Sequence, residues 1–353
     1  MNNIKKILLT GGGTGGSVSP LLAIYESLVE KQAKFEFLWI GTKNGPEKKM
    51  VEEVGINFKT IASGKLRRYF SWKNLEDLFK IFFGTIQSIF IIIKFKPDLV
   101  ISAGSFVSVP VVFVAWFFRV KILIHQQDLR PGLANNLMSF FANVITVTFE
   151  KSLCDYGKKA QYIGNPVRKI FYQKLNSVNN FKNNLPIVLI IGGGTGSLVL
   201  NKIVQNSLAE LTKICQVIHL TGKGKVLKNK TKIKNYQSFE FCNTAQIASL
   251  LQAAEIVVSR CGISTLTELS FLSKPSLLIP LANTHQEDNA NFFGELKASI
   301  ALEEKNLSKA EFLNNIKNLL QNKLLRDKLA HNIHKVIKKN ANNEMVKIIM
   351  SLI

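Results

Sequence analysis

The sequence predicts an α/β protein of two doubly wound domains, each built on a parallel sheet. Apolar, β-rich runs alternate along the chain with segments whose apolar residues recur at helical spacing. Two of these runs enter glycine-rich turns of the same plan, GGGTGGS from Gly11 and GGGTGS from Gly192. The length of 353 residues is also enough for two domains with a core each. We therefore expect two similar halves whose sheets face each other across a cleft.

The first glycine-rich turn predicts a strand, a tight turn and a helix. The strand from Ile7 enters five glycines within Gly11–Gly16, and the chain leaves through Ser19 and Pro20 into a segment of helical spacing. We expect Ser19 to be the N-cap and Pro20 the first helical residue. Free backbone N–H groups and the positive end of the helix dipole would then face the turn, which is typical of a phosphate site.

Dinucleotide binding is one interpretation of this turn, and the next strand argues against it. Gly11, Gly13 and Gly16 match the pattern G-x-G-x-x-G. That mechanism needs an acidic residue at the end of the following strand to hold the ribose. The run 35–43 ends in Gly-Thr-Lys instead, and the second copy, 216–220, runs into Thr-Gly-Lys-Gly. Nicotinamide chemistry is therefore disfavoured.

The net charge of +22 suggests an anionic partner. The basic residues are spread along the chain, and no zinc-finger, helix-turn-helix or RNA-binding signature gathers them, so we expect no nucleic-acid partner. Two stretches that mix aromatic and basic residues, 65–96 and 116–121, favour an anionic membrane surface. The alternative is that these aromatics are core: the two interpretations are balanced for Lys65–Phe83, and core is favoured for Ile89–Ile93.

No segment is expected to span a bilayer, because a transmembrane helix needs ~20 mainly apolar residues and the run 81–93 is shorter. The four cysteines form no C-x-x-C pair, so neither a disulfide framework nor a zinc site is expected. With no visible signal peptide, the chain is expected to be cytosolic.

Further strands are predicted at 98–102, 121–125 and 144–148, with polar loops at 103–106 and 125–132. In an open parallel sheet, ligands bind beyond the carboxyl ends of the strands, where these loops lie. The segment 164–168 (GNPVR) is expected at the hinge between a first domain of residues 1–165 and a second of residues 166–339.

The second half contains one more strand, polar turn and helix, from Ala254 to Leu269. The N–H groups at the start of this helix would suit a diphosphate, and Glu268, one turn in, would accept hydrogen bonds from two ribose hydroxyls. The alternative for Glu268 is a solvated glutamate that interacts favourably with its helix dipole.

Eight motifs in order along nearly the whole chain resemble one family. They are GGTGG (12–16), GSFVSVP (104–110), PGLAN (131–135), GNPVR (164–168), GGGTGS (192–197), HLTGKG (219–224), RCGISTLTE (260–268) and HQEDNA (285–290). The chain is similar to the MurG family, which transfers N-acetylglucosamine from UDP-N-acetylglucosamine to the 4-hydroxyl of undecaprenyl-pyrophosphoryl-muramoyl-pentapeptide in peptidoglycan synthesis.

The resemblance implies the GT-B fold, with two Rossmann-like domains and a last helix that returns to the first domain. Residues 340–343 interrupt the terminal helical pattern, so residues 344–353 are expected to form this helix and residues 340–353 to belong to the first domain. It also implies an inverting enzyme with no cofactor and no required metal, peripheral on the cytoplasmic side of the inner membrane. The sequence agrees with metal independence in having no D-x-D motif.

The resemblance also implies a donor site. In the second domain, Cys242 would bind the uracil through its backbone, Glu268 the ribose and Gln286 the sugar, with Gly194 nearby and Arg168 helping from the hinge. The turn at the diphosphate would comprise Ile263, Ser264, Thr265, Leu266 and Thr267. Thr14, Gly15 and Gly16 of the first domain would close on the sugar or diphosphate, and Asp128 of the same domain would also contact the donor.

The sequence departs from the family on the acceptor side. Ser17 stands where the family has histidine, His125-Gln126-Gln127-Asp128 replaces HEQN, and Gly194 replaces a serine. Serine cannot replace imidazole as a base at neutral pH. We therefore expect Asp128 to take the proton from the acceptor hydroxyl, with His125 as a second candidate that is as often a structural hydrogen-bonder.

Two other functions stay open at this point. One is a related UDP-sugar transferase with a different lipid acceptor, because the departures cluster on that side. The other is a non-catalytic relative that binds UDP-sugar.

Overall fold

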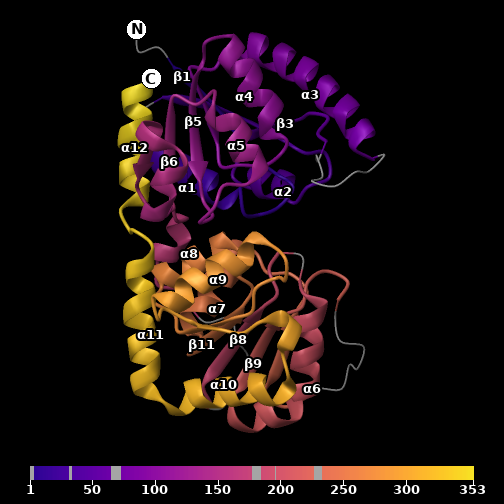
Figure 1. Cartoon of the computed structure of the whole chain (residues 1–353), viewed down its shortest axis with the longest axis vertical. Helices are drawn as coiled ribbons and strands as arrows, with labels where there is room; N and C mark the ends of the chain where they lie inside the picture. Colours follow the sequence, from indigo (N-terminus) through magenta and orange to yellow (C-terminus); the bar gives the residue numbers. More distant parts are fainter. Residues whose placement is uncertain (1–3, 32–33, 65–72, 177–183, 195, 226–232) are drawn as a thin grey trace. The chain divides into compact units, whose positions relative to one another are not determined.

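The chain folds into two α/β units (Figure 1). The computed structural model describes residues 4–31, 34–64, 73–176, 184–194, 196–225 and 233–353. One unit comprises Met1–Arg168 and Lys338–Ile353, and the other comprises Lys169–Ile337. The division expected from the sequence lies at residues 165/166 and 339/340, close to these positions.

The first unit is built on a seven-stranded, all-parallel sheet. Its strand order is β3-β2-β1-β4-β5-β6-β7. The strands are β1 (Lys5–Thr10), β2 (Phe35–Gly41), β3 (Asn57–Thr60), β4 (Leu99–Ser102), β5 (Lys121–Gln126), β6 (Val144–Val147) and β7 (Ala160–Tyr162). β1, β4 and β5 are almost wholly buried apolar runs, as expected for strands covered on both faces.

Helices cover both faces of this sheet (Figure 1). They are α1 (Ser19–Val29), α2 (Glu47–Glu52), α3 (Lys73–Phe95), α4 (Ser108–Phe117), α5 (Leu133–Ser139) and α12 (Ala341–Leu352), with 3₁₀ turns η1 (Glu150–Asp155) and η2 (Gly157–Lys159). One core layer contains α1 and α12, and the other contains α3, α4 and α5.

Two expectations about helix starts were wrong. Ser19 is the first residue of α1 and Pro20 the second, so Val18 rather than Ser19 is the N-cap. The chain turns one residue earlier than expected because the carbonyl of Gly15 accepts from the N–H groups of both Val18 and Ser19. The last helix begins at Ala341 rather than at residue 344. It starts earlier because the half-buried Asn342 side chain, instead of breaking the helix, bonds the backbone N–H and carbonyl of Val167.

The second unit repeats the plan with six parallel strands in the order β10-β9-β8-β11-β12-β13. The strands are β8 (Ile187–Ile191), β9 (Gln216–Leu220), β10 (Tyr236–Phe239), β11 (Ile256–Ser259), β12 (Ser276–Leu278) and β13 (Ile300–Ala301). The helices are α6 (Leu198–Ile214), α7 (Thr244–Ala253), α8 (Ile263–Phe271), α9 (His285–Glu295), α10 (Lys309–Gln321) and α11 (Lys323–Val336), with 3₁₀ turns η3 (Lys169–Tyr172) and η4 (Glu304–Asn306).

Each glycine-rich turn lies at the topological switch point of its sheet. The first follows β1, where the strand order reverses between β1 and β4, and the second follows β8, where it reverses between β8 and β11. Chain connections on the two sides of such a point run in opposite directions and leave a crevice at the carboxyl ends of the strands. The topology therefore puts both turns where open α/β sheets bind ligands.

Helix α3 packs on the first unit by one face only. Gly84, Ser88 and Ile92, spaced four apart, are buried, and the backbone N–H of Ala62 donates to Gln87 Oε1 at 2.7 Å. In the described part of the chain, one stretch of this helix, Glu76–Phe95, is long and apolar enough to cross a membrane by length and composition. The expectation that no apolar run reaches that length was therefore wrong. The buried face of α3 nevertheless shows that this helix packs on the sheet of the first unit.

Candidate functional site

The start of α8 is an open, polar helix N-terminus at the carboxyl edge of the second sheet. Gly262 is the N-cap and supplies no side-chain bond, and the first helical hydrogen bond runs from Leu266 N to Gly262 O. The N–H groups of the first turn therefore point beyond the sheet edge. No described atom lies within 4 Å of the place where a Cβ of Gly262 would be, so a ligand has room to approach.

The five residues expected at a diphosphate divide into two groups. Ile263, Leu266 and Thr267 are buried, and the Thr267 hydroxyl donates to the carbonyl of Ile263 at 2.8 Å. Ser264 and Thr265 are half-buried. The groups of this turn that suit an anion are therefore its backbone N–H groups and the hydroxyls of the half-buried Ser264 and Thr265, while the Thr267 hydroxyl bonds within the helix.

The second glycine-rich turn lies beside this helix start, because β8 and β11 are neighbours. Gly193 and Gly196 have positive φ values of 83° and 71°, which favour glycine. An added Cβ at Gly196 would also overlap the carbonyl of Thr221. Gly194 is exposed and faces open space among the described atoms. Thr195 lies outside the described residues.

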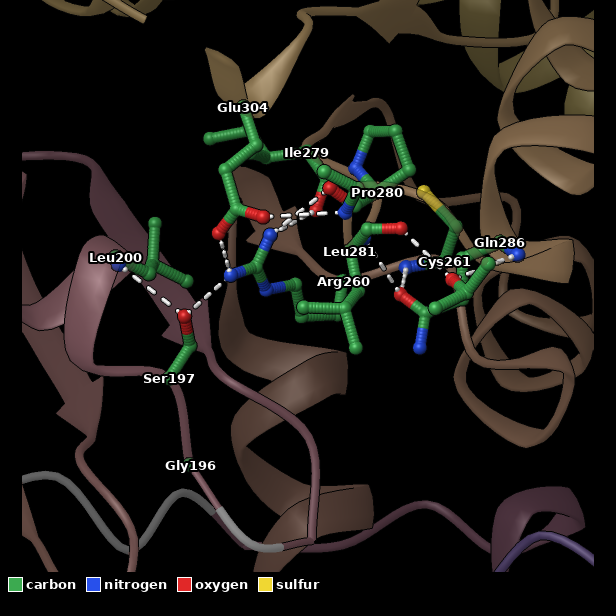
Figure 2. A network of polar contacts seen from close by, with 12 residues as sticks. Gly196, Ser197, Leu200, Arg260, Cys261, Ile279, Pro280, Leu281, Gln286 and Glu304 are labelled. Carbon is green, nitrogen blue, oxygen red and sulfur yellow. Dashed lines mark hydrogen bonds and ion pairs between the residues drawn. The ribbon is translucent and has the colours of Figure 1, made fainter. Parts of the chain in front are cut away.

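A buried arginine joins the loops around this edge (Figure 2). The Arg260 guanidinium donates to the carbonyls of Ile279 and Pro280 at 3.1 and 2.9 Å. It also donates to Ser197 Oγ at 2.6 Å and pairs with the carboxylate of Glu304. Ser197 is the N-cap of α6. The Arg260 side chain thus connects the second glycine-rich turn, the end of β12 and η4. Glu304 was not among the residues predicted from the sequence, since nothing adjacent to it in the sequence signals this contact.

Gln286 is held in the same network by its carbonyl oxygen. Its Oε1 accepts from the backbone N–H groups of Cys261 at 3.2 Å and Leu281 at 3.1 Å. Figure 2 shows its amide nitrogen directed away from these bonds. Gln286 is thus brought to the start of α8, with its donor group turned outward.

The remaining residues expected to bind the donor lie on other parts of the chain. Glu268 is half-buried on α8, one turn in. Cys242 follows the edge strand β10 and is buried, and burial raises the pKa of its thiol to about 11, so the thiol stays neutral. Arg168 belongs to the first unit, where its Nε bonds Glu26 Oε1 on α1.

The first glycine-rich turn is already occupied by a carboxylate of the chain. Glu47 is fully buried, and its two oxygens accept from Gly13 N at 3.1 Å and Thr42 N at 2.7 Å, with a third bond from the Thr42 hydroxyl. An added Cβ at Gly12 or Gly45 would overlap this carboxylate. The anion at Gly13 is therefore Glu47, and an external phosphate is left with the outer part of the turn, Thr14 to Gly16.

We expect Glu47→Ala to lower the free energy of unfolding by about 3 kcal/mol, because the backbone donors of Gly13 and Thr42 lose their acceptor inside the protein. Urea titration of the purified variants would measure the loss. Glu52→Ala, on the exposed part of the same helix, is the control and should change stability by less than about 0.5 kcal/mol. Equal stabilities of the two variants would contradict this role of Glu47.

Ser17 and His125 lie inside the first unit rather than on its surface. Ser17 is 8 % exposed, and its hydroxyl donates to the carbonyl of Gly12 at 3.4 Å. His125 is fully buried, with Nδ1 3.0 Å from Thr146 Oγ1 and Nε2 2.8 Å from Asn165 Oδ1. Burial lowers the pKa of His125 to about 4. The structure therefore favours the structural alternative for His125, since both ring nitrogens are engaged.

We expect His125 to make stability depend on pH. Its pKa is about 4 in the folded chain against an ordinary 6.5, so as pH falls from 6.5 to 4 only the unfolded chain takes up the proton. The stability advantage of wild type over His125→Gln should therefore shrink over this window, by up to about 3 kcal/mol. Unfolding free energies at pH 7.0 and 4.5 measure it, and an advantage equal at both pH values would contradict it.

Asp128 lies in the loop after β5, at the carboxyl edge of the first sheet, and is half-buried. The strands that carry Asp128 and the first glycine-rich turn, β5 and β1, are separated only by β4. Asp128 is thus the candidate base that the structure leaves near solvent, whereas Ser17 and His125 are buried.

An exposed apolar patch covers α3, α4 and α5 of the first unit. Its members, all more than a third exposed, are Leu78, Phe79, Phe82, Phe83, Phe90, Ile93, Phe113, Trp116, Phe117, Phe118, Leu137 and Phe140. α4 contacts both other helices, so the helices that carry these side chains are neighbours. The expectation of core for Ile89–Ile93 was right for Ile92 and wrong for Phe90 and Ile93. Residues 65–72 of the stretch lie outside the described residues.

Comparison with known proteins identifies the relatives of both units. The model of the glycosyltransferase family 28 N-terminal domain matches residues 7–147, and that of the C-terminal domain matches residues 187–347. The chain is 38% identical over 355 residues to the UDP-N-acetylglucosamine--N-acetylmuramyl-(pentapeptide) pyrophosphoryl-undecaprenol N-acetylglucosamine transferase of Clostridium tetani, with 98% of this chain and 97% of the relative covered.

A second relative and a solved structure agree with this result. The transferase of the same description from Clostridium kluyveri is 39% identical over 325 residues, covering 90% of this chain and 91% of the relative. The crystal structure of Acinetobacter baumannii MurG superposes with a TM-score of 0.74 at 22% identity, covering 98% of this chain and 99% of that one. That likeness supports the two-domain GT-B fold.

Proposed function

We propose the function of this chain from its family, because it belongs to glycosyltransferase family 28 and, within it, to the MurG transferases. It transfers N-acetylglucosamine from UDP-N-acetylglucosamine to lipid-linked N-acetylmuramoyl-pentapeptide. The observation that carries this proposal is the 38% identity across 98% of the chain to a transferase of that description. The open helix N-terminus at the switch point of the second sheet supports it, since such a terminus binds diphosphates.

The donor occupies the carboxyl edge of the second sheet. The first turn of α8 takes the diphosphate through its N–H groups and the hydroxyls of Ser264 and Thr265. Glu268, one turn further, accepts from the ribose hydroxyls, while the outward amide of Gln286 donates to the sugar. As the bond to the sugar breaks, negative charge grows on the departing UDP, and the helix N-terminus stabilises it. Cys242 contributes backbone to the uracil, because its neutral thiol is buried.

The acceptor is activated by the first unit. Asp128 takes the proton of the attacking hydroxyl, and the hydroxyl oxygen forms its bond to the anomeric carbon as UDP leaves, which inverts that carbon. Ser17 and His125 keep the surrounding loops in place instead of taking a proton, because both are buried and hydrogen-bonded. Thr14, Gly15 and Gly16 form the accessible part of the first glycine-rich turn and contact the transferred sugar or its diphosphate. Arg168, bonded to Glu26, supports the donor from the hinge.

The deciding experiment is transfer of labelled N-acetylglucosamine from its UDP donor to a short-chain lipid-linked muramoyl-pentapeptide, with chelator present. Product in the presence of chelator would support the donor, the acceptor and metal independence together. Lack of product, while the UDP-sugar still raises the melting temperature, would overturn the proposed acceptor or the activity. A diacylglycerol-type acceptor and unlabelled UDP-sugars are run beside it to identify a different transferase.

We also propose that the apolar patch binds the cytoplasmic surface of the inner membrane. Twelve exposed apolar side chains on three adjacent helices form a larger surface than a soluble monomer normally leaves bare. Four basic residues are exposed near the C-terminal ends of α3 and α4: Lys94 in the last turn of α3, and Lys96, Arg119 and Lys121 beyond the helix ends. Aromatic side chains that enter the headgroup region beside basic residues are typical of a peripheral enzyme on an anionic membrane. This arrangement would bring Asp128 of the same unit towards a lipid-anchored acceptor.

We expect the double variant Trp116→Ala, Phe117→Ala to bind phosphatidylglycerol vesicles about tenfold more weakly. It lacks two aromatic side chains that would enter the headgroup region of the membrane. Vesicle flotation measures the change. Leu324→Ala, at an equally exposed apolar side chain of the second unit, is the control and should bind as wild type does. Equal binding of the double variant and the control would contradict the proposed surface.

A further inference from the structure

The side chain of Gln126 is buried beneath the loop that carries Asp128. Gln126 is the last residue of β5 and is 2 % exposed. Its Nε2 donates to two loop carbonyls, Asp128 O at 2.7 Å and Arg130 O at 3.1 Å. Its Oε1 accepts from Asn135 Nδ2 at 2.6 Å and from the Tyr156 hydroxyl at 2.9 Å. All four hydrogen bonds that a primary amide can make are therefore formed.

Side-chain hydrogen bonds hold three consecutive backbone carbonyls of the loop. Gln126 binds those of Asp128 and Arg130, and the Ser152 hydroxyl donates to the one between them, Leu129 O, at 2.8 Å. A backbone carbonyl can only accept, so the group facing it must be a donor. A carboxylate at position 126 would place an acceptor against the two carbonyls, and the loop would have to move away.

We propose that Gln126 is a positioning residue for Asp128: its amide holds the backbone of the catalytic loop so that the Asp128 carboxylate meets the acceptor hydroxyl. The inference rests on the proposed function, because it assigns the amide a task in the proton transfer. A displacement of about 1 Å of a catalytic group is enough to cost a large factor in rate. Gln126 thus supports the base, Asp128, and does not itself transfer a proton.

Two substitutions separate this role from a purely structural one. Gln126→Met removes the polar contacts without adding charge. We expect kcat to fall at least about tenfold, while the KM for UDP-N-acetylglucosamine, most of whose proposed contacts lie in the other unit, changes by less than about twofold. Gln126→Glu adds a carboxylate against the backbone of Asp128. A neighbouring negative charge disfavours ionisation, so the acidic limb of the kcat profile should move to higher pH by about one unit. A structural role alone would lower the melting temperature and leave that limb in place.

Hydrogen exchange of the loop amides tests the support directly, without any activity. Exchange at residues 127–132 should be faster in Gln126→Met than in wild type, and unchanged exchange would overturn the proposal even in an inactive enzyme. Failure of wild-type transfer would instead overturn the proposed function. Tyr156→Phe, which removes one bond to Gln126 Oε1, is the milder variant should Gln126→Met not fold, and should speed the same exchange. Gln161→Glu, the same charge change at an exposed glutamine of β7, is the control.

Discussion

Asp128→Asn should lower kcat by about 100-fold or more, because a positioned general base contributes roughly 10²–10⁴-fold to the rate. The asparagine amide keeps the size of the side chain and cannot take a proton. Most of the proposed donor contacts belong to the second unit, so the KM for UDP-N-acetylglucosamine should change much less than kcat. The acidic limb of the kcat profile should also disappear, since it reports the ionisation of the base. Steady-state transfer assays from pH 5 to 9 measure all three quantities.

The control for this prediction is a second aspartate near the same loop. Asp155 pairs with the exposed Arg130 at 3.3 Å, so Asp155→Asn removes a carboxylate and one surface ion pair. It should leave kcat within about twofold, since exposed pairs are worth little. Full activity of Asp128→Asn would remove Asp128 from the mechanism. With Ser17 and His125 both buried, the proton would then have to go to solvent or to the substrate itself.

Glu268→Ala should lower kcat/KM for UDP-N-acetylglucosamine by at least about 100-fold, mainly through KM. Two hydrogen bonds from ribose hydroxyls to a carboxylate are lost, and bonds to a charged group are worth about 1.5–3 kcal/mol each. The ribose is remote from the bond that breaks, so the loss falls on binding of both ground and transition states. Kinetics at varied donor concentration and calorimetric titration with UDP both measure it.

Glu311→Gln is the matched control for Glu268. Glu311 is an exposed glutamate in the first turn of α10 of the same unit, so its loss changes the charge but removes no contact to the donor. Its KM should equal that of wild type. If Glu268→Ala bound UDP as tightly as this control, the alternative of a solvated glutamate would be the correct one.

Local patterns were sufficient to predict most of the fold. The apolar run Gln216–Leu220 is β9 residue for residue, and the runs at 98–102, 121–125 and 144–148 are β4, β5 and β6 to within a residue or so at each end. Strand and helix periodicity depends on residues that are close in the sequence, and glycine turns need positive φ values that few other residues adopt. The structure adds that each glycine-rich turn lies where its sheet reverses strand order.

The candidate site was predictable in its types of residue but not in its contacts. The motif from Arg260 to Glu268 pointed to a helix N-terminus, and α8 begins within it, at Ile263. The same motif did not show that Arg260 pairs with Glu304, 44 residues further along the chain. Nor did the first glycine-rich turn show that Glu47, 34 residues from Gly13, would occupy it.

The sequence by itself thus determined the α/β class, the two repeated halves, the order of the strands along the chain and the family. Only the tertiary structure decided which polar groups meet: that His125 is buried between Thr146 and Asn165, and that Gln126 holds the loop of Asp128. It also decided that most aromatic residues of α3 and α4 are exposed, whereas Phe95 is in the core. The physical reason is the separation along the chain of the residues that interact. Backbone conformation follows from neighbours in sequence, whereas burial and side-chain pairing depend on groups that only the folded chain brings within a few ångströms.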